Sequence, residues 1–370
     1  MIFHPAAAKQ SFMMETALEE QQLRLSAKRI RATLQDPAKG AALAQLVYVS
    51  DDQPGITRRR KGKGFAYFLD NRLIRDKDTL QRIRMLRIPP AWEHVWICRQ
   101  ANGHLQATGL DKQGRKQYLY HSRWVALRGQ TKFFNLYSFG KALPAIREQV
   151  SKDLGREGLG INKVMAAIVQ IMEQTTIRIG NEFYEKLYGS FGLSTLKNRH
   201  VKINGSSIRF VFKGKKGVEH DISMRSRKLA KLIQRCKEIP GKDLLKYVDE
   251  EGTVHDVTSG DINAYIRQIS GGDFTSKDFR TWAGSVECIR ALAEGSNGAS
   301  KGEIKQQLVE ALDKVAFHLG NTRSVCKKHY VHPAIMECYE SGGLAGLSGK
   351  TAPDAALNEY EQMLMCLLEK

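Results

Sequence analysis

The sequence predicts an α+β protein with a small strand-rich N-terminal domain and a larger, mainly helical domain that contains one three-stranded β-meander. Short runs of β-branched and aromatic residues, separated by turn residues, dominate residues 46–122. From residue 123 onward, apolar residues recur mostly at helical spacing. A chain of 370 residues favours about two domains. We therefore expect an N-terminal helical extension over residues 1–45, an α+β domain over 46–122 and a helical domain over 123–370.

The N-terminal third contains signals for both helices and strands. Residues 15–45 read as a helix that breaks near Pro37 and Gly40. The basic segment "RRRKGKG" is expected to be a solvated loop, with contact to a phosphate backbone as the alternative. The segment "DKDTLQRIRMLRIPP" is expected to be a helix that closes at Pro89 and Pro90. The expected strands are "LVYVS", "FAYFLD", "HVWICRQ", "LQATGL" and "KQYLYH".

The second domain has one strand-rich region within its helices. Residues 201–223, "VKINGSSIRFVFKGKKGVEHDIS", read as three short strands joined by two turns, with Lys215 in the second turn. Farther along, Thr275 and Asp278 have the spacing of a capping box. This spacing predicts that Arg280 lies in the first turns of a helix.

A tyrosine beside a proline follows the next expected helix. The segment "EIKQQLVEALDKVAFHLG" predicts a helix that stops at Gly320, and Tyr330 is expected on a short turn after it. Residues 351–370 predict a C-terminal amphipathic helix. Positive charge near a phenol favours its ionised form and attracts phosphate. The residues that precede the tyrosine directly are Lys327, Lys328 and His329.

Charge and motif content exclude several classes of protein. There are 58 Lys and Arg residues against 39 Asp and Glu, a formal net charge of +19 that favours polyanionic partners. The chain has neither an apolar run long enough to span a membrane nor a signal-peptide pattern. Scattered cysteines without a CxxC pair indicate a cytoplasmic protein and no zinc site. The stretch "GGLAGLSGKT" has the wrong glycine spacing for a nucleotide-binding loop.

Four separated segments together resemble the type IB DNA topoisomerases, most closely their short poxvirus-like bacterial form, over roughly residues 46–340. These segments are "TTIRIGNEFY", "FKGKKG", "SKDFRTW" and the stretch from Asn321 to Tyr330. The resemblance implies the tyrosine recombinase/type IB topoisomerase catalytic fold. It also implies relaxation of supercoiled DNA through a 3′-phosphotyrosyl intermediate, without ATP or metal. The catalytic residues that it implies are Arg178, Lys215, Arg280, Asn321 and Tyr330.

One position departs from the pattern of the poxvirus and nuclear enzymes, which have histidine where this chain has Asn321. An amide can donate a hydrogen bond to a phosphate oxygen but cannot transfer a proton. The rest of the set suits phosphoryl transfer, because two arginines can stabilise negative charge on a phosphate and a lysine can protonate a leaving oxygen.

Double-stranded DNA is the expected partner, and the resemblance places "GLDKQGRKQYLYH" as a base-reading strand. No cofactor, metal, nucleotide or membrane is expected to bind. A monomer suffices for this chemistry, and the expected location is the bacterial cytoplasm, at the nucleoid. The expected DNA-binding residues are Arg115, Lys116, Gln117, Tyr118, Tyr120, Tyr184 and Lys277.

Two other functions remain open from the sequence. A site-specific tyrosine recombinase uses the same catalytic residue types, although it often has histidine at the position of Lys277 and a helical N-terminal domain. A non-catalytic basic DNA-binding protein would explain the net charge but not the ordered set of residues.

Overall fold

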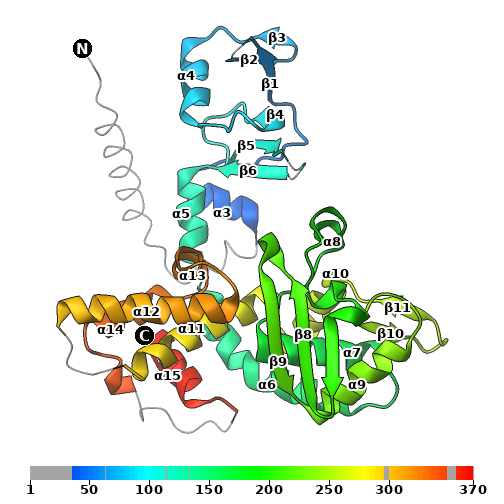
Figure 1. The fold of residues 1–370 in the computed structure, drawn as a ribbon. Coiled ribbons are helices and arrows are strands. Elements are labelled where there is room, and N and C mark those ends of the chain that lie inside the picture. Colours follow the sequence, from blue (N-terminus) through cyan, green and yellow to red (C-terminus); the bar gives the residue numbers. More distant parts are fainter. Residues whose placement is uncertain are drawn as a thin grey trace. The chain divides into compact units, whose positions relative to one another are not determined.

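The chain divides into two compact units, residues 1–134 and residues 135–370 (Figure 1). The computed structural model describes residues 36–62, 64–112, 114, 116–131, 133–295, 300–347 and 356–369. Residues 1–35, which form most of the expected N-terminal extension, lie outside this part. Helix α5 (Ser122–Thr131) belongs to the first unit, so the division falls later than the boundary expected near residue 122.

The first unit is built on a six-stranded antiparallel sheet with the order β3-β2-β1-β4-β5-β6. Helix α4 contributes the buried Ile83 to a core that also contains Val95, Ile97 and Ala107 of the sheet. A second cluster joins helix α3 to α5 through Ala41, Trp124 and Leu127. The bounds are α3 Pro37–Leu43, β1 Ile56–Lys61, β2 Gly64–Leu69, β3 Arg72–Leu73, α4 Lys77–Met85, β4 Glu93–Ile97, β5 Leu105–Leu110 and β6 Lys116–Tyr120.

The basic segment expected to be a loop is instead strand β1, between β2 and β4. Its arginines are accommodated because their guanidinium groups find partners within the unit. Arg58 donates to the carbonyl oxygens of Pro89 and Trp92 and stacks over Phe65. By contrast, the expected strand at residues 46–50 forms only an isolated bridge at Val47.

The proline expected to break the N-terminal helix instead begins one. Pro37 is the first residue of α3, and the side chain of Asp36 accepts hydrogen bonds from the backbone N–H groups of Ala38 and Lys39. Proline is favoured at this position because its missing N–H would have no helical partner.

The second unit is mainly helical and contains the expected three-stranded meander β7-β8-β9. Helices α7 and α9 pack against this sheet, and α11 lies beside α12 (Figure 1). A small hairpin, β10-β11, completes the described part of this unit. Its longer helices are α6 Asn135–Gly155, α7 Ile161–Thr175, α9 Arg227–Glu238, α10 Ser259–Ser270, α11 Ser276–Ala293, α12 Lys301–Leu319 and α15 Glu359–Leu368. The shorter elements are α8 Glu182–Tyr188, α13 Arg323–His329, α14 Pro333–Glu340, β7 Val201–Asn204, β8 Ser207–Lys213, β9 Glu219–Arg225, β10 Lys246–Val248, β11 Val254–Asp256 and the 3₁₀ turns Leu193–Thr195, Asn198–His200, Lys215–Gly217 and Ala345–Leu347.

Helix boundaries in the second unit follow the local signals in the sequence. Thr275 and Asp278 form the expected capping box at the start of α11. Helix α12 ends at Gly320, whose φ of 56° lies in the left-handed region. Pro333 is the first residue of α14, which separates that helix from the end of α13.

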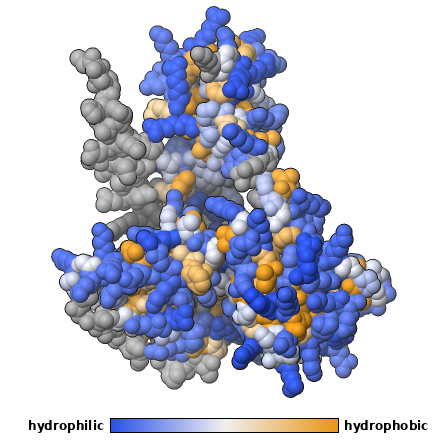
Figure 2. Space-filling view, viewed as in Figure 1, coloured by the Kyte–Doolittle hydropathy of each residue, from blue (hydrophilic) through white to orange (hydrophobic). Residues whose placement is uncertain are grey.

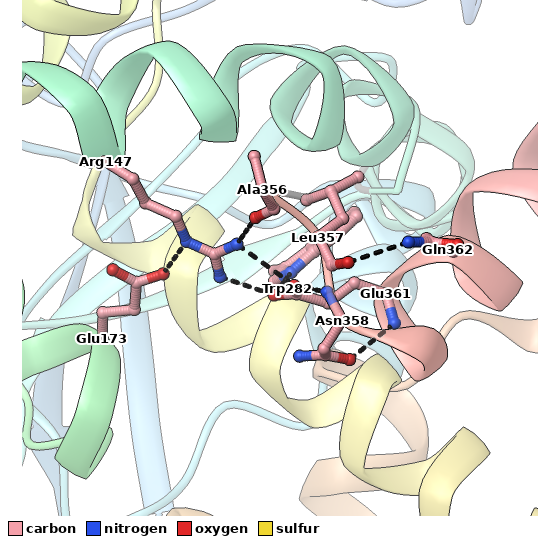
Figure 3. Close-up of polar contacts among 8 residues, drawn as sticks. All are labelled: Arg147, Glu173, Trp282, Ala356, Leu357, Asn358, Glu361 and Gln362. Atoms are coloured by element: carbon pink, nitrogen blue, oxygen red, sulfur yellow. Dashed lines mark hydrogen bonds and ion pairs between the residues drawn. The ribbon is translucent and has the colours of Figure 1, made fainter. Parts of the chain in front are cut away.

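The C-terminal helix α15 is fixed within its own chain by a buried ion-pair network (Figure 3). Arg147 of α6 forms ion pairs with Glu173 of α7, at 2.8 Å, and with Glu361 of α15, at 2.7 Å. The indole N–H of Trp282 in α11 donates to Glu361 at 3.0 Å. Four helices are therefore joined through two carboxylates, one guanidinium group and one indole N–H. Burial raises the pKa of Glu173, whereas hydrogen bonds from Arg147 and Trp282 outweigh burial and lower the pKa of Glu361.

Most of the visible surface of each unit is hydrophilic, with hydrophobic residues scattered over it (Figure 2). Among the described residues, no helix combines the length and apolar character that crossing a membrane requires.

The network around Glu361 gives a test of how α15 is held. Glu361→Ala should lower the free energy of unfolding by about 3 kcal/mol, because it leaves the partly buried Arg147 and the buried Trp282 donors without this acceptor. Urea unfolding followed by tryptophan fluorescence measures the change. As a control, Asp221→Ala removes an exposed ion pair with Arg209 and should change stability little. Equal effects of the two substitutions would contradict a structural role for the network.

Candidate active site

The side chain of Arg280 is buried at the centre of the second unit. Only 5% of the residue is exposed. Its guanidinium group donates to the carbonyl oxygen of Thr176, at the end of α7, and to that of Leu319, at the end of α12, at 2.8 Å. Arg280 therefore ties together two chain segments far apart in sequence. Burial, with a smaller effect from the charge of Arg178, lowers the pKa of Arg280 to about 10, so the group remains charged at neutral pH.

Arg178 lies just beyond α7, in a segment that forms no helix. Helix α7 ends at Thr175, and Thr176 adopts a left-handed conformation with φ of 55°. The hydroxyl of Thr175 donates to the carbonyl of Ile171 and accepts from the N–H of Ile177, which satisfies the backbone as the helix stops. From the following extended segment, Arg178 donates to the side-chain oxygen of Asn321 at 2.7 Å.

Tyr330 is the residue that follows α13, and its backbone is held from two sides. Its N–H donates to the carbonyl of Cys326, and its carbonyl accepts from the hydroxyl of the fully buried Ser285 in α11 at 3.1 Å. A Cβ atom at Gly284 would lie 2.9 Å from that carbonyl oxygen, so the close approach of α11 requires glycine there. The Arg280 guanidinium carbon lies 5.3 Å from the centre of the Tyr330 ring.

The charges that act most strongly on Tyr330 come from distant parts of the sequence. Burial alone would raise the pKa of its phenol, but the charges of Arg280, Arg178 and Lys215, together with hydrogen bonding to Arg280, lower it from the ordinary value. The neighbouring Lys327 has an exposed side chain. Positive charge therefore lowers the pKa of Tyr330, as expected. The main sources of that charge are Arg280, Arg178 and Lys215 and not the basic residues next to the tyrosine in sequence.

Lys215 stands in the turn between β8 and β9, as expected, and its side chain is exposed. The turn is tight, since Lys216 and Gly217 both have positive φ values. Sequence analysis did not single out His220 of β9, whose ring lies between this turn and the residue before Asn321. The signal that could have identified His220 is its pairing with Phe212 across β8 and β9, and this pairing can be recognised only when the register of the two strands is known.

The candidate DNA-binding residues fall into three groups. On β6, the exposed Tyr118 and Tyr120 have nearly parallel rings with centres 6.0 Å apart, and Lys116 is exposed on the same side of the strand. Gln117 alternates to the other side and donates to Asp111. Lys277 is exposed in the first turn of α11. The third group consists of Arg115 and Tyr184. Residue Arg115 and the side chain of Tyr184 lie outside the part of the chain that the structure describes.

Among the described residues, no group of three or more His, Cys, Asp or Glu side chains is arranged to hold a metal ion. The stretch "GGLAGLSGKT", which resembles a nucleotide-binding loop but has the wrong glycine spacing, lies partly outside the described residues. Within the described part of that stretch, Leu344 and Leu347 are buried.

Comparison with known protein families gives two matches along the chain. Residues 121–344 match a family model described as "Eukaryotic DNA topoisomerase I, catalytic core". The chain belongs to the type IB DNA topoisomerases. Residues 64–111 match a second model, "Bacterial DNA topoisomerase IB, N-terminal domain".

Viral topoisomerases are among the similar curated proteins. "DNA topoisomerase 1B" of Acanthamoeba polyphaga mimivirus is 33% identical over 296 residues, which cover 78% of this chain and 88% of the viral protein. "DNA topoisomerase 1B" of Vaccinia virus (strain Copenhagen) is 24% identical over 309 residues, which cover 79% of this chain and 93% of the viral protein. These matches favour the topoisomerase over the recombinase. The catalytic-core match ends at residue 344, before α15 begins.

The origin of the charge around Tyr330 can be tested by titration. Arg178→Ala should raise the pKa of the Tyr330 phenol, because it removes a positive charge that stabilises the phenolate. Tyrosine ¹³Cζ chemical shifts followed against pH report this value, and Tyr330→Phe identifies the resonance. Lys327→Ala is the matched control and should leave the titration unchanged. A shift in the control but not in Arg178→Ala would show that the adjacent basic residues dominate.

Proposed function

We propose that this chain relaxes supercoiled duplex DNA by cutting and rejoining one strand through Tyr330. The phenolic oxygen attacks a backbone phosphorus, the bond from phosphorus to the 5′ oxygen breaks, and a 3′-phosphotyrosyl ester forms. The departing 5′ oxygen takes up a proton. The reverse reaction restores the strand, and because the ester conserves the energy of the bond, religation needs no ATP. The two arginines take the charge-stabilising role that metal ions have in many nucleases.

The observation that carries this proposal is the gathering of Arg178, Arg280 and Lys215 so that their charges act on Tyr330. Attack on phosphate develops extra negative charge on the non-bridging oxygens, and fixed guanidinium groups stabilise such charge without reorganising. Arg280 suits this role because, within the described residues, its buried Nε has no hydrogen-bond acceptor. A phosphate oxygen that reached this buried atom would satisfy it while the other two nitrogens remain bound to Thr176 and Leu319.

Two further residues are assigned roles on chemical grounds. Asn321 accepts from Arg178 through its side-chain oxygen, and its amide nitrogen donates one N–H to the carbonyl oxygen of Leu319 at 3.4 Å, so the second N–H is the one proposed to donate to a phosphate. Lys215 is the proposed proton donor to the 5′ oxygen, since an exposed lysine in a tight turn can reach along a groove of the duplex.

The DNA duplex is proposed to contact both units. The net charge of +19 supports binding dominated by phosphate contacts, which should weaken as salt increases. The face of β6 with Lys116, Tyr118 and Tyr120 is proposed to lie in a groove, and Gln117 and Arg115 are proposed as further DNA contacts. Tyr184 and Lys277 are proposed as contacts of the catalytic unit. A monomer would suffice, and the bacterial nucleoid in the cytoplasm is the proposed location.

Covalent trapping tests the nucleophile directly. Tyr330→Phe should abolish the denaturant-stable protein–DNA adduct and leave non-covalent binding intact, because only the hydroxyl is lost. Tyr339→Phe is the matched control, since the Tyr339 hydroxyl donates to Gln307 and should take no part in cleavage. Arg178→Ala and Arg280→Ala should each slow single-turnover cleavage by about 10²–10³, and Asn321→Ala should cost less. An adduct in Tyr330→Phe would refute the assignment.

A change of leaving group tests Lys215. If Lys215 protonates the 5′ oxygen, then Lys215→Ala should cleave ordinary DNA slowly but should cleave DNA with a 5′-bridging sulfur at close to the wild-type rate, because a thiolate leaves without a proton. Arg280→Ala should show little such rescue, since its contacts are to non-bridging oxygens. Near-normal cleavage of both substrates by Lys215→Ala would instead make Lys215 a solvated turn residue.

A further inference from the structure

The imidazole of His220 fills a space between two turns that carry residues of the candidate site. A Cβ atom at Gly214, the residue before Lys215, would lie 2.6 Å from both Cδ2 and Nε2 of this ring. A Cβ atom at Gly320, the residue before Asn321, would lie 2.7 Å from its Cε1. The ring thus packs so closely against both glycines that neither position could carry a side chain without moving the ring.

The strand that carries His220 fixes the position of this ring. His220 of β9 pairs with Phe212 of β8, and the two rings stack with centres 4.9 Å apart and an interplanar angle of 21°. Phe212 is buried, whereas His220 is half-buried. No hydrogen bond to the ring nitrogens of His220 is present among the described residues, so packing and stacking, rather than a polar partner, hold the ring in place.

The electrostatic surroundings keep the ring neutral. Burial lowers the pKa of His220, and the positive charges of Arg178 and Arg280 lower it further, whereas Glu219 on the same strand acts in the opposite direction. A neutral, flat side chain can pack directly against two backbone turns beside two arginines. A lysine or arginine in this place would add a further positive charge beside Arg178 and Arg280.

We propose that His220 is a positioning residue that sets the Lys215 turn against the Asn321 turn. This inference rests on the proposed role of Lys215 as proton donor. The catalytic groups on α11, α12 and α13 are tied together by Arg280 and Ser285, but Lys215 stands on an exposed hairpin turn. The His220 ring provides a contact from that turn to the backbone beside Asn321. Loss of the ring would leave the hairpin turn without this contact and would misplace the Lys215 ammonium group.

The leaving-group experiment separates this role from a general structural one. His220→Ala should slow cleavage of ordinary DNA by about 10²-fold, the effect expected when a catalytic group is displaced by about 1 Å. It should cleave the 5′-sulfur substrate at close to the wild-type rate, because that reaction does not use the Lys215 proton. A merely destabilised active site would instead lose activity on both substrates.

Two more variants test shape and coupling. His220→Phe keeps a flat ring that can stack on Phe212, so it should retain most of the activity on ordinary DNA. In a Lys215→Ala background, adding His220→Ala should cause little further loss on ordinary DNA, because the group that His220 positions is already absent. Additive losses in the double variant would overturn the inference.

The matched control is His255→Ala. His255 also stacks on an aromatic residue across a β-ladder, Tyr247, with ring centres 5.1 Å apart and the same interplanar angle of 21°. This pair lies in the β10-β11 hairpin, outside the candidate site, so the substitution should leave cleavage of both substrates unchanged. Equal losses in His220→Ala and His255→Ala would show a general effect of losing a stacked pair, and the inference would fail.

The outcomes also separate this inference from the proposed function. If Lys215→Ala is rescued by the sulfur substrate and His220→Ala is slow on both substrates, the role of Lys215 stands and the inference about His220 is wrong. If neither variant is rescued, Lys215 is not the proton donor, and the inference falls with it. Rescue of both variants, with retention of activity in His220→Phe, is the result that we expect.

Discussion

The candidate site depends on the need to satisfy one buried guanidinium group. Placing a charged side chain in a protein interior is costly unless its donors find acceptors. Arg280 finds them in two carbonyl groups at helix ends, those of Thr176 and Leu319, which have no partner within their own helices. The same contacts therefore satisfy two of the three guanidinium nitrogens, cap two helices and fix the chain just before Arg178 and Asn321. A lysine could not do this, because a single ammonium group lacks the fixed fork of donors.

Local signals in the sequence were enough to predict most of the elements that carry the site. The capping box at Thr275 and the end of α12 before Gly320 each depend on a few neighbouring residues, and both predictions were confirmed. The turn at Lys215 was also predicted, because alternating apolar residues and glycines define a hairpin without help from the rest of the fold. The resemblance to topoisomerases added the order of the residues, which local signals do not supply.

The errors occurred where tertiary contacts override local preference. The charged sequence of strand β1 predicted a loop, but Arg58 in this strand is stabilised by carbonyl groups from residues some thirty positions away. The end of α7 depends on Thr176, whose left-handed backbone is tied by its hydroxyl to the carbonyl of His318. The charges acting on Tyr330 likewise come from three other segments of the chain. None of these contacts could be predicted from the residues that lie next to them in the sequence.

The site combines groups held in two different ways. Tyr330 and Arg280 are attached to the helical core through buried contacts, including the hydroxyl of Ser285, so their relative positions are fixed before any substrate arrives. Lys215 is exposed on a hairpin turn. This difference suits the chemistry, because stabilising charge on a phosphate requires groups that do not reorganise, whereas a proton donor must reach the leaving oxygen of a strand that then moves away. The proposed contact of His220 would limit where the turn can lie without burying Lys215. Burial would weaken the hold of the ammonium group on the proton that it is proposed to deliver.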